Sequence, residues 1–296
     1  MVAESEPRTR ALIGIVGLGL VGRAVARRLI AAGYSVCGYD IAESACAAAG
    51  ETGVDLLPDA QAVARDAKTI LLSLLTSENR RELMWGKQAM ADALQTGALV
   101  LDAITGRPED IEEDAQRLAK DGVKLVDVCL SGSSQVIGDG RALALVGDNE
   151  ENADYAGLLQ VFSKAQYYFG APGQGNRVKL IVNLVFGLNR LVLAEALGLA
   201  EHAGFDLNDI LEVLRAGDTY STVMDAKGPK MVTGIYEPPA ARLAQHAKDV
   251  HLILEFAREV GAAVPVSETH ANLIDSLVRD GWGDFDNAAI FEAYRL

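Results

Sequence analysis

Apolar residues in the first half of the chain recur with two different periods. Short, mostly apolar runs occur at residues 12–16, 35–39, 69–75, 98–103, 123–128 and 142–146. Between most of these runs, apolar residues recur about every 3.6 positions, which is the period of an α-helix. Strands that alternate with helices indicate βαβ units, in which neighbouring strands run parallel. From residue 12 to about residue 169 we therefore predict an α/β domain built on a parallel, doubly wound sheet.

The pattern changes after the glycine- and proline-rich segment 170–175. From residue 176 onward apolar residues follow only the helical period. Glycine or proline interrupts that period at Gly204, Gly217, Gly228-Pro229, Pro238-Pro239, Gly261 and Gly281. Both residue types destabilise helices, so each interruption predicts a helix end. We predict two domains, the α/β domain over residues 1–172 and an all-α domain over residues 173–296.

One predicted helix, Leu180–Ala200, is as long and apolar as a membrane span, which needs about 20 residues. It also carries Asn183, Asn189, Arg190 and Glu195, and the charged side chains among them are costly at the centre of a bilayer. A helix that is apolar on most sides can instead be buried between domains or subunits. We therefore expect no membrane association, and a homodimer or homotetramer joined through the helical domain.

The composition of the chain excludes some classes of binding partner. The net charge of −14 argues against nucleic acid, because phosphate contacts need a basic surface and no cluster of Lys or Arg occurs. Cys37, Cys46 and Cys129 form no CxxC pair, so we expect reduced thiols and a cytoplasmic protein. The four histidines lack the spacing of metal ligands, so we expect no metal site.

The segment Gly17–Gly22 fits the pattern GxGxxG. An apolar strand precedes it and a helix follows it, which is the context that gives this short motif its meaning. In such a turn the first glycine permits the tight bend, the second lets the backbone approach a pyrophosphate, and the third lets the helix pack on the strand. The first domain is therefore predicted to be a Rossmann dinucleotide-binding domain. Its expected cofactor contacts in this turn are Gly17, Leu18, Gly19, Leu20, Val21 and Gly22.

Asp40 ends the second predicted strand, where an acidic residue accepts hydrogen bonds from the adenosine ribose and repels a 2′-phosphate. Ile41 follows, at a place where an arginine could otherwise bind that phosphate. We therefore expect NAD as the cofactor. NADP stays possible, because Arg23, Arg27 and Arg28 are near in the sequence.

Two later segments carry candidate substrate chemistry. Ser131, Gly132 and Ser133 follow a strand, and small residues there leave amides and hydroxyls free to bind an anion such as a carboxylate. Lys179 and Asn183 are four positions apart and share one helix face. Because burying an unpaired ammonium is costly, a functional role for Lys179 is favoured over a structural one. Lys248, read alone, is an ordinary charge in the first turn of a helix.

Together these segments resemble the β-hydroxyacid dehydrogenases, a family that includes 3-hydroxyisobutyrate dehydrogenase and tartronate semialdehyde reductase. The resemblance runs from residue 13 to about residue 293 and rests on residues 102–108, 127–133, 173–183 and 248–257. It departs from the family where Cys129 replaces a proline, Ser133 a glycine and Val182 an asparagine. The resemblance implies further cofactor contacts at Leu74, Leu75, Asn79, Thr105 and Lys248.

The expected activity is an NAD(P)-dependent interconversion of a small β-hydroxy acid and its semialdehyde or ketone by hydride transfer. Lys179 is the expected general acid/base, Asn183 orients the same oxygen, and residues 131–133 hold the carboxylate. The alternatives are an imine reductase-like oxidoreductase and a cofactor-binding scaffold without activity. Which hydroxy acid reacts, and in which direction, stays open in the sequence.

Overall fold

The computed structural model describes residues 10–150 and 154–295. The chain divides into two compact units, with the boundary between Lys179 and Leu180. This boundary lies inside helix α8 (Gln174–His202), a few residues after the predicted boundary at 172/173.

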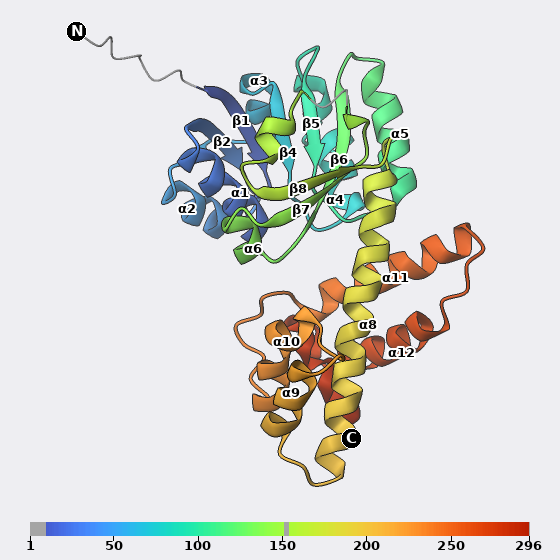
Figure 1. The fold of residues 1–296 in the computed structure, drawn as a ribbon. Helices are drawn as coiled ribbons and strands as arrows, with labels where there is room; N and C mark the ends of the chain where they lie inside the picture. Colours follow the sequence, from blue (N-terminus) through green and yellow to red (C-terminus); the bar gives the residue numbers. More distant parts are fainter. Residues whose placement is uncertain (1–9, 151–153, 296) are drawn as a thin grey trace. The chain divides into compact units, whose positions relative to one another are not determined.

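The first unit is built on one sheet of strands in the order β3-β2-β1-β4-β5-β6-β7-β8 (Figure 1). Strands β1 to β6 pair in parallel, in the order expected of a dinucleotide-binding sheet. This confirms the predicted Rossmann domain. Its described elements are β1 (Arg10–Val16), α1 (Leu20–Ala31), β2 (Tyr34–Tyr39), α2 (Glu43–Gly50), β3 (Asp55–Leu56), α3 (Ala60–Asp66), β4 (Thr69–Leu72), α4 (Ser77–Trp85), η1 (Met90–Ala93), β5 (Leu99–Asp102), α5 (Pro108–Ala119), β6 (Lys124–Ser131), α6 (Ser134–Gly138), β7 (Ala142–Val146), α7 (Ala156–Leu159) and β8 (Ser163–Tyr168).

The last part of the sheet departs from the predicted parallel arrangement. Strand β7 pairs antiparallel to β6, and β8 then pairs parallel to β7. Only residues 132–141 connect β6 to β7, which is short for the crossover that two parallel strands need. The sequence pattern also missed β3 and β8. Strand β8 reads Ser163-Lys164-Ala165-Gln166-Tyr167-Tyr168 and lacks an apolar run.

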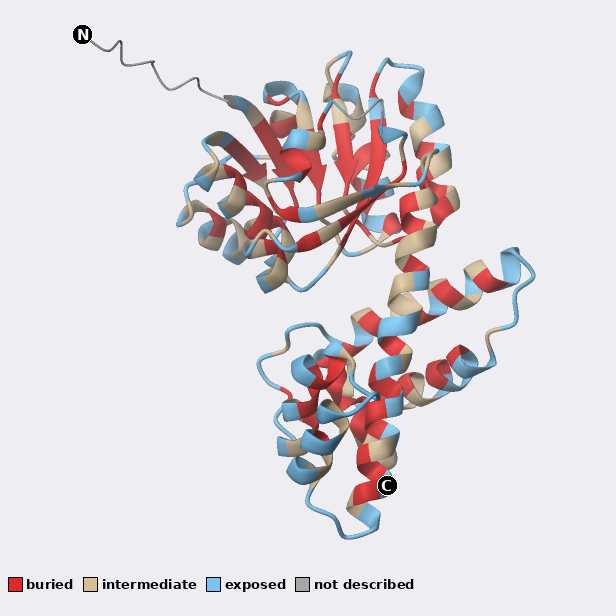
Figure 2. Cartoon of the chain, in the orientation of Figure 1, coloured by how far each residue is buried: buried red, intermediate tan, exposed pale blue. Residues whose placement is uncertain are grey.

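Two apolar clusters cover the two faces of the sheet. Leu71 belongs to the cluster that contains α1, whereas its neighbours Ile70 and Leu72 belong to the cluster that contains α3 and α4. This alternation is what a strand covered on both faces requires, because successive side chains point to opposite sides. The central strands are accordingly buried along their length (Figure 2).

The second unit is helical, as predicted. Its described elements are the remainder of α8, then α9 (Leu207–Ala216), α10 (Thr222–Thr233), α11 (Leu243–Glu259), α12 (Pro265–Arg279), η3 (Trp282–Asp284) and η4 (Asn287–Tyr294). The predicted helix end at Gly228-Pro229 is wrong, because both residues lie inside α10. A side chain at Gly228 would collide with Leu211 of α9, so this glycine permits close helix packing rather than a break.

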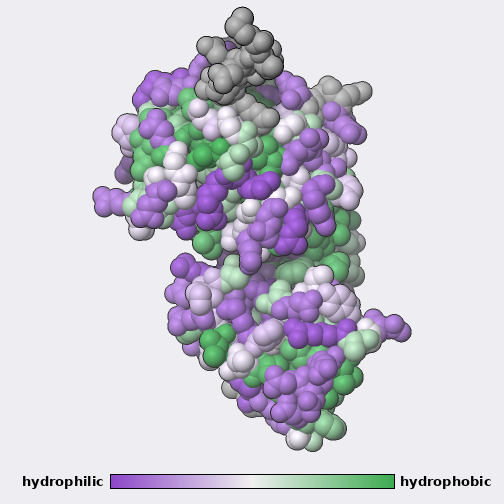
Figure 3. Space-filling model, turned by 60° about the vertical axis from the view of Figure 1, so that its left-hand side comes forward, coloured by the Kyte–Doolittle hydropathy of each residue, from purple (hydrophilic) through white to green (hydrophobic). Residues whose placement is uncertain are grey.

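Helix α8 supplies part of the second unit's core through Leu191, Leu193, Ala194 and Leu197. Among the described residues it is the helix that is long and apolar enough to cross a membrane, with 39% of its most apolar window buried. Hydrophilic residues cover most of the face drawn in Figure 3, with smaller apolar patches between them. The core contacts identify α8 as a packing helix of this unit.

Candidate active site

The turn between β1 and α1 has the geometry of a dinucleotide-binding turn. Gly17 has a φ of 95°, which side chains rarely adopt, and a Cβ there would overlap the carbonyl oxygen of Ser73. A Cβ on Gly22 would overlap the carbonyl oxygen of Gly17. At Gly19 a Cβ would meet nothing within 4 Å. The first and third glycines are thus required by packing, whereas the second faces open space where a pyrophosphate fits against the first turn of α1.

Asp40 lies at this turn, as predicted, and is already bonded to the backbone. Its Oδ2 accepts a hydrogen bond from the amide of Leu18 at 2.7 Å, and its Oδ1 accepts one from Ala42 at 2.8 Å. Each carboxylate oxygen can accept a second hydrogen bond, so both remain able to bind ribose hydroxyls. Arg23 donates to the carbonyl of Leu18 at 3.2 Å and is the cation at the turn, while Ile41 is 84% exposed.

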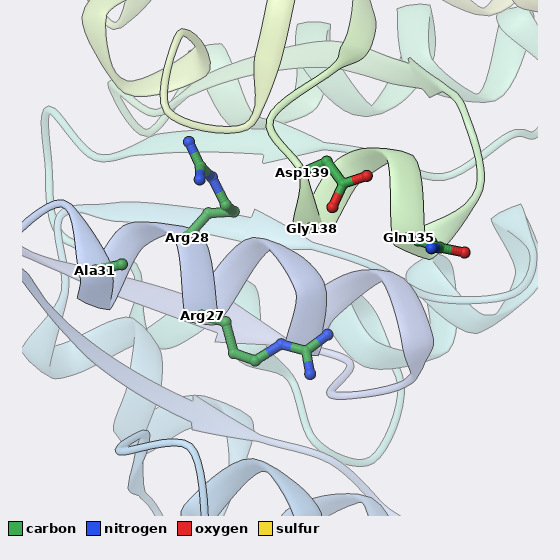
Figure 4. A pocket seen from close by; sticks show the side chains of 6 residues that line it. All are labelled: Arg27, Arg28, Ala31, Gln135, Gly138 and Asp139. Carbon is green, nitrogen blue, oxygen red and sulfur yellow. The ribbon is translucent and has the colours of Figure 1, made fainter.

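The other two arginines of α1 lie near its far end. They line a hollow of about 340 Å³ whose walls are Arg27, Arg28, Ala31, Gln135, Gly138 and Asp139. Figure 4 shows the side chains of Arg27 and Arg28 pointing in different directions from neighbouring positions of α1. Arg28 also donates to the carbonyl of Val161 at 2.9 Å. These contacts direct Arg28 away from the cofactor turn, whereas Arg23 contacts the turn at Leu18.

The loops after β4 and β5 border the same edge of the sheet. The amide of Ser73 bonds to the carbonyl of Val16 at 2.9 Å, which brings Leu74 beside Gly17. Leu75 is 67% exposed and follows in the same loop. Asn79 lies in the first turn of α4, where its amide bonds to Thr76 Oγ1 at 3.1 Å. The loop after β4 therefore runs from the glycine turn toward the solvent, as a cofactor-lining segment would.

The loop after β5, which carries Thr105, is fixed on both sides. Ile104 donates its amide to Asp102 Oδ1 at 3.0 Å, and Gly106 donates its amide to Asn176 Oδ1 at 2.9 Å. Asp102 in turn pairs with the fully buried Arg80, 2.5 Å from its carboxylate. Burial raises the pKa of Asp102 to about 6, against the opposing effect of Arg80. Sequence reasoning did not identify Arg80, because a buried ion pair between α4 and β5 leaves no local pattern.

The candidate carboxylate-binding loop begins where β6 ends. Ser131 still pairs with Leu143 of β7, and Gly132 has a φ of 143°. The hydroxyl of Ser133 accepts a hydrogen bond from the amide of Val136 at 3.3 Å and so caps the short helix α6. Its hydroxyl proton remains available for donation. This capping contact is a second role for Ser133 that the sequence alone did not indicate.

Lys179 contacts the same strand end. Its Nζ donates a hydrogen bond to the carbonyl oxygen of Leu130 at 2.9 Å, one residue before Ser131. Lys179 and the candidate carboxylate loop therefore meet at the carboxyl end of β6, within one compact unit. Lys179 and Ser131 are 48 positions apart in the sequence, and both lie next to the backbone carbonyl of Leu130.

Asp127 fixes the start of α8 and with it the position of Lys179. It is fully buried in β6 and accepts hydrogen bonds from the amides of Gly173 at 2.9 Å and Asn176 at 2.7 Å. These amides belong to the entry and first turn of α8, where backbone donors lack helical partners. Burial raises the pKa of Asp127, while the donated hydrogen bonds lower it. The motif at residues 127–133 contains Asp127, but the sequence alone does not indicate that it holds α8.

Asn183 has a defined partner inside the helical unit. Its Nδ2 donates a hydrogen bond to Asp249 Oδ2 at 3.0 Å, and the other oxygen of Asp249 lies 3.2 Å from Lys248 Nζ. Asp249 therefore fixes the side-chain amide of Asn183, so that Oδ1 of Asn183 points away from the carboxylate of Asp249. The sequence placed Lys248 and Asn183 in the site, whereas Asp249 was missed as the residue that joins them.

Comparison with known proteins finds family matches over both parts of the chain. Residues 12–170 match the family described as the NAD binding domain of 6-phosphogluconate dehydrogenase. Residues 173–294 match the family described as NAD-binding of NADP-dependent 3-hydroxyisobutyrate dehydrogenase. Both matches support NAD(P) as the cofactor.

Individual relatives cover nearly the whole chain. L-threonate dehydrogenase of Escherichia coli K12 is 27% identical over 95% of this chain and 94% of its own. The 2-(hydroxymethyl)glutarate dehydrogenase of Eubacterium barkeri is 28% identical over 95% and 94%. The crystal structure of 3-hydroxyisobutyrate dehydrogenase from Salmonella typhimurium superposes with a TM-score of 0.88, at 24% identity over 95% and 99%. The chain belongs to the β-hydroxyacid dehydrogenase family of NAD(P)-dependent oxidoreductases.

Proposed function

We propose that the protein oxidises the hydroxyl group of a small β-hydroxy acid, and reduces the corresponding semialdehyde or ketone, with Lys179 as the general acid/base. The observation that carries this proposal is the 2.9 Å hydrogen bond from Lys179 Nζ to the carbonyl of Leu130. It holds the amine beside Ser131, at the start of the loop suited to a carboxylate. A proton acceptor next to an anion-binding loop is what the oxidation of a hydroxy acid requires.

The carboxylate is assigned to residues 131–133. The protein carries a net charge of −14, so an acidic substrate needs local donors to overcome an unfavourable field. Gly132 is exposed and leaves its amide approachable, and the hydroxyls of Ser131 and Ser133 add donors. Binding at this loop fixes which carbon of the substrate lies beside Lys179.

The proton and the hydride leave the substrate from different atoms. The glycine turn and Asp40 would hold NAD(P)⁺, which would supply the hydride acceptor for the carbon that bears the hydroxyl. Lys179 as a neutral amine accepts the hydroxyl proton, and as an ammonium returns it in the reverse reaction. The hydrogen bond to Leu130 uses one N–H of the amine. The other N–H and the lone pair of the neutral amine therefore point away from the carbonyl of Leu130. Asn183, one helical turn further along α8, orients the same oxygen and is itself held by Asp249.

We propose NAD as the preferred cofactor. Support comes from Asp40, which carries its charge at the position of the ribose hydroxyls, and from the exposed apolar Ile41 beside it. Lys248 is assigned to the nicotinamide end, in line with the family resemblance. The free thiols of Cys37, Cys46 and Cys129 fit the reducing cytoplasm, where we place the protein.

The test is a turnover screen that records cofactor reduction at 340 nm. Each substrate is offered with NAD⁺ and with NADP⁺: 3-hydroxyisobutyrate, glycerate and four-carbon sugar acids, with cyclic amines as the imine-reductase arm. We expect turnover with hydroxy acids, and the extra hydroxyls of Ser133 and Ser134 favour the sugar acids. Turnover of the amines alone would support the imine-reductase alternative. Cofactor binding without any turnover would support the scaffold alternative.

A further inference from the structure

A group of polar side chains is buried inside the helical unit, apart from the residues assigned above. It consists of Arg190 of α8, His246 of α11 and His270 of α12, whose exposed fractions are 1%, 8% and 2%. Three separate helices thus each contribute one ionisable side chain to the interior of the helical unit. Ionisable side chains are rarely buried without partners, so their hydrogen bonds need to be accounted for.

The guanidinium of Arg190 lacks a counter-ion among the described residues. Its Nε and Nη2 are buried and have no hydrogen-bond partner. The carboxylates whose charges act on Arg190 are engaged elsewhere: Asp286 pairs with Lys227 at 2.7 Å, and Asp249 bonds to Asn183. Burial without an ion pair lowers the pKa of Arg190 to about 10. Nε and Nη2 form one edge of the guanidinium, the edge that binds the two oxygens of a carboxylate.

The two imidazoles lie one helical turn away, against Gly187. A Cβ on Gly187 would lie 3.0 Å from Cε1 of His246 and 3.3 Å from Cε1 of His270. The ring centroids are 5.1 Å apart, and the Nε2 atom of each ring is buried with no hydrogen-bond partner in the part of the chain that the structure describes. Burial and the charge of Arg190 lower the pKa of both rings, that of His270 to about 4. Each ring is therefore neutral at pH 7 and can donate one N–H.

We propose that Arg190, His246 and His270 form a binding site for one small carboxylate inside the helical unit. The carboxylate receives two hydrogen bonds from the Nε–Nη2 edge of Arg190, and the Nε2–H groups of the imidazoles complete its shell. The negative charge of the carboxylate neutralises the positive charge of the Arg190 guanidinium, whereas a water molecule in the same position would not. Arg190 is seven residues beyond Asn183, which is about 10 Å along the helix, so this site is separate from the reacting hydroxyl.

The first experiment measures thermal stability of the full chain during an acetate titration at constant ionic strength, with chloride as the balancing anion. A ligand that binds only the folded state raises Tm with the logarithm of its concentration above Kd, by roughly 5 °C at a hundredfold excess over Kd. We expect Arg190→Met to remove this rise, and Arg190→Lys to weaken acetate binding at least tenfold because a lysine lacks the planar edge. The control is Arg258→Met, an exposed arginine of α11, which should respond like the unmodified protein. An equal response of Arg190→Met and the unmodified protein would overturn the proposal.

The second experiment needs no substitution in the site. The chain contains four histidines, so its imidazole Cε1–H signals can be followed by NMR during the same titration. The signals of His246 and His270 should shift together with the Kd found from Tm, while those of the exposed His202 and His251 stay in place. A hydroxy acid that shifts the same pair and competes with acetate would identify a substrate carboxylate as the ligand; acetate alone would identify a free carboxylate. Four static signals, or four that drift in parallel, would contradict the site.

Discussion

At the scale of single residues, Asp40 holds the cofactor turn and also carries the charge that selects the cofactor. Its two oxygens accept hydrogen bonds from Leu18 and Ala42, so removing the whole side chain would disturb the turn itself. Asp40→Asn keeps an oxygen that can accept the hydrogen bond from Leu18 and removes the charge. We expect the ratio of kcat/KM for NAD to that for NADP to fall by roughly tenfold, the equivalent of about 1.4 kcal/mol.

The control for Asp40→Asn is Glu43→Gln, an exposed acidic residue in the first turn of α2. It should leave the ratio of the two cofactors nearly unchanged. Steady-state rates with both cofactors measure the ratio directly. If Asp40→Asn kept the ratio of the unmodified protein, the selectivity would lie elsewhere, and Arg23 would be the next residue to substitute.

Lys179 is the residue on which the proposed chemistry depends. Lys179→Ala removes the proton acceptor, so kcat should fall by about 10²–10⁴-fold. Its Nζ contacts Leu130 rather than the glycine turn, so cofactor affinity should change little when measured by fluorescence quenching. Lys164→Ala, at an exposed position of β8, is the matched control and should retain full activity. A Lys179→Ala enzyme with more than about a tenth of normal activity would remove lysine from the acid/base role.

The residues that the sequence identified and those it missed differ in physical character. Gly17, Gly22 and Asp40 belong to a local turn whose spacing follows from backbone geometry, so a short motif reveals them. Asp127 and Asp249 act on groups that lie 46 and 66 positions away in the chain. Such contacts are set by the packing of distant elements, and no local pattern encodes them.

At the scale of elements, Asp127 joins β6 to the start of α8. Its carboxylate accepts hydrogen bonds from the amides of Gly173 and Asn176, which would otherwise be buried without partners. Asp127→Ala should lower the free energy of unfolding by about 2–4 kcal/mol, because each orphaned buried donor costs about 1–3 kcal/mol. Denaturant unfolding measures this loss, with the exposed Asp121→Ala as the control. A loss under 1 kcal/mol would mean that α8 begins independently of Asp127.

The packing of α8 against α11 and α12 makes stability depend on pH. The pKa of His270 is lowered to about 4 in the folded state, from 6.5 in the unfolded chain. The folded state therefore binds fewer protons, and the stabilisation that is present above pH 6.5 is lost as the pH falls toward 4. This single group accounts for roughly 3 kcal/mol across that range. Unfolding free energies should thus decline below pH 6.5 in carboxylate-free buffer.

The variant that tests this pH dependence is His270→Gln, which cannot take up the proton. It should make the decline between pH 6.5 and 4 less steep, and the remaining decline includes His246, whose pKa burial also lowers. His251→Gln is the control, since His251 is an exposed histidine beside Asp275. A decline of unchanged steepness in His270→Gln would show that other groups produce it.

Element types were more predictable than element pairings. The alternation of runs predicted the parallel core, yet the antiparallel β6–β7 pair depends on a connection too short to cross over. Pro229 stands inside α10 because close packing at Gly228 against Leu211 outweighs the lost helical hydrogen bond. In both cases the tertiary structure differs from what the local sequence pattern predicts.

At the scale of the whole molecule, α8 carries an apolar side that is exposed among the described residues of the helical unit. Val185, Val192 and Leu199 recur every seven residues and are 54%, 61% and 75% exposed. This spacing places them on one stripe of the helix, as at a helix–helix interface. We expect a homodimer or homotetramer that buries this stripe, measured by light scattering at micromolar concentration.

Val192→Asp should shift that assembly toward the monomer, because an unpaired charge would be buried in the interface. The control is Glu212→Ala on the exposed side of α9, which should leave the assembly intact. A monomeric unmodified protein would contradict the prediction. The apolar stripe would then need another explanation.

Hydride transfer from a hydroxy acid to the nicotinamide is the central step of the proposed reaction. The most direct measurement uses the best acid of the turnover screen, deuterated at the carbon that bears the reacting hydroxyl, followed by mass spectrometry of the reduced cofactor. We predict one deuterium in the reduced nicotinamide per turnover and a slower rate than with the undeuterated acid wherever the transfer limits turnover. Reduced cofactor without deuterium, or no reduction by any hydroxy acid while NAD binds, would contradict the account.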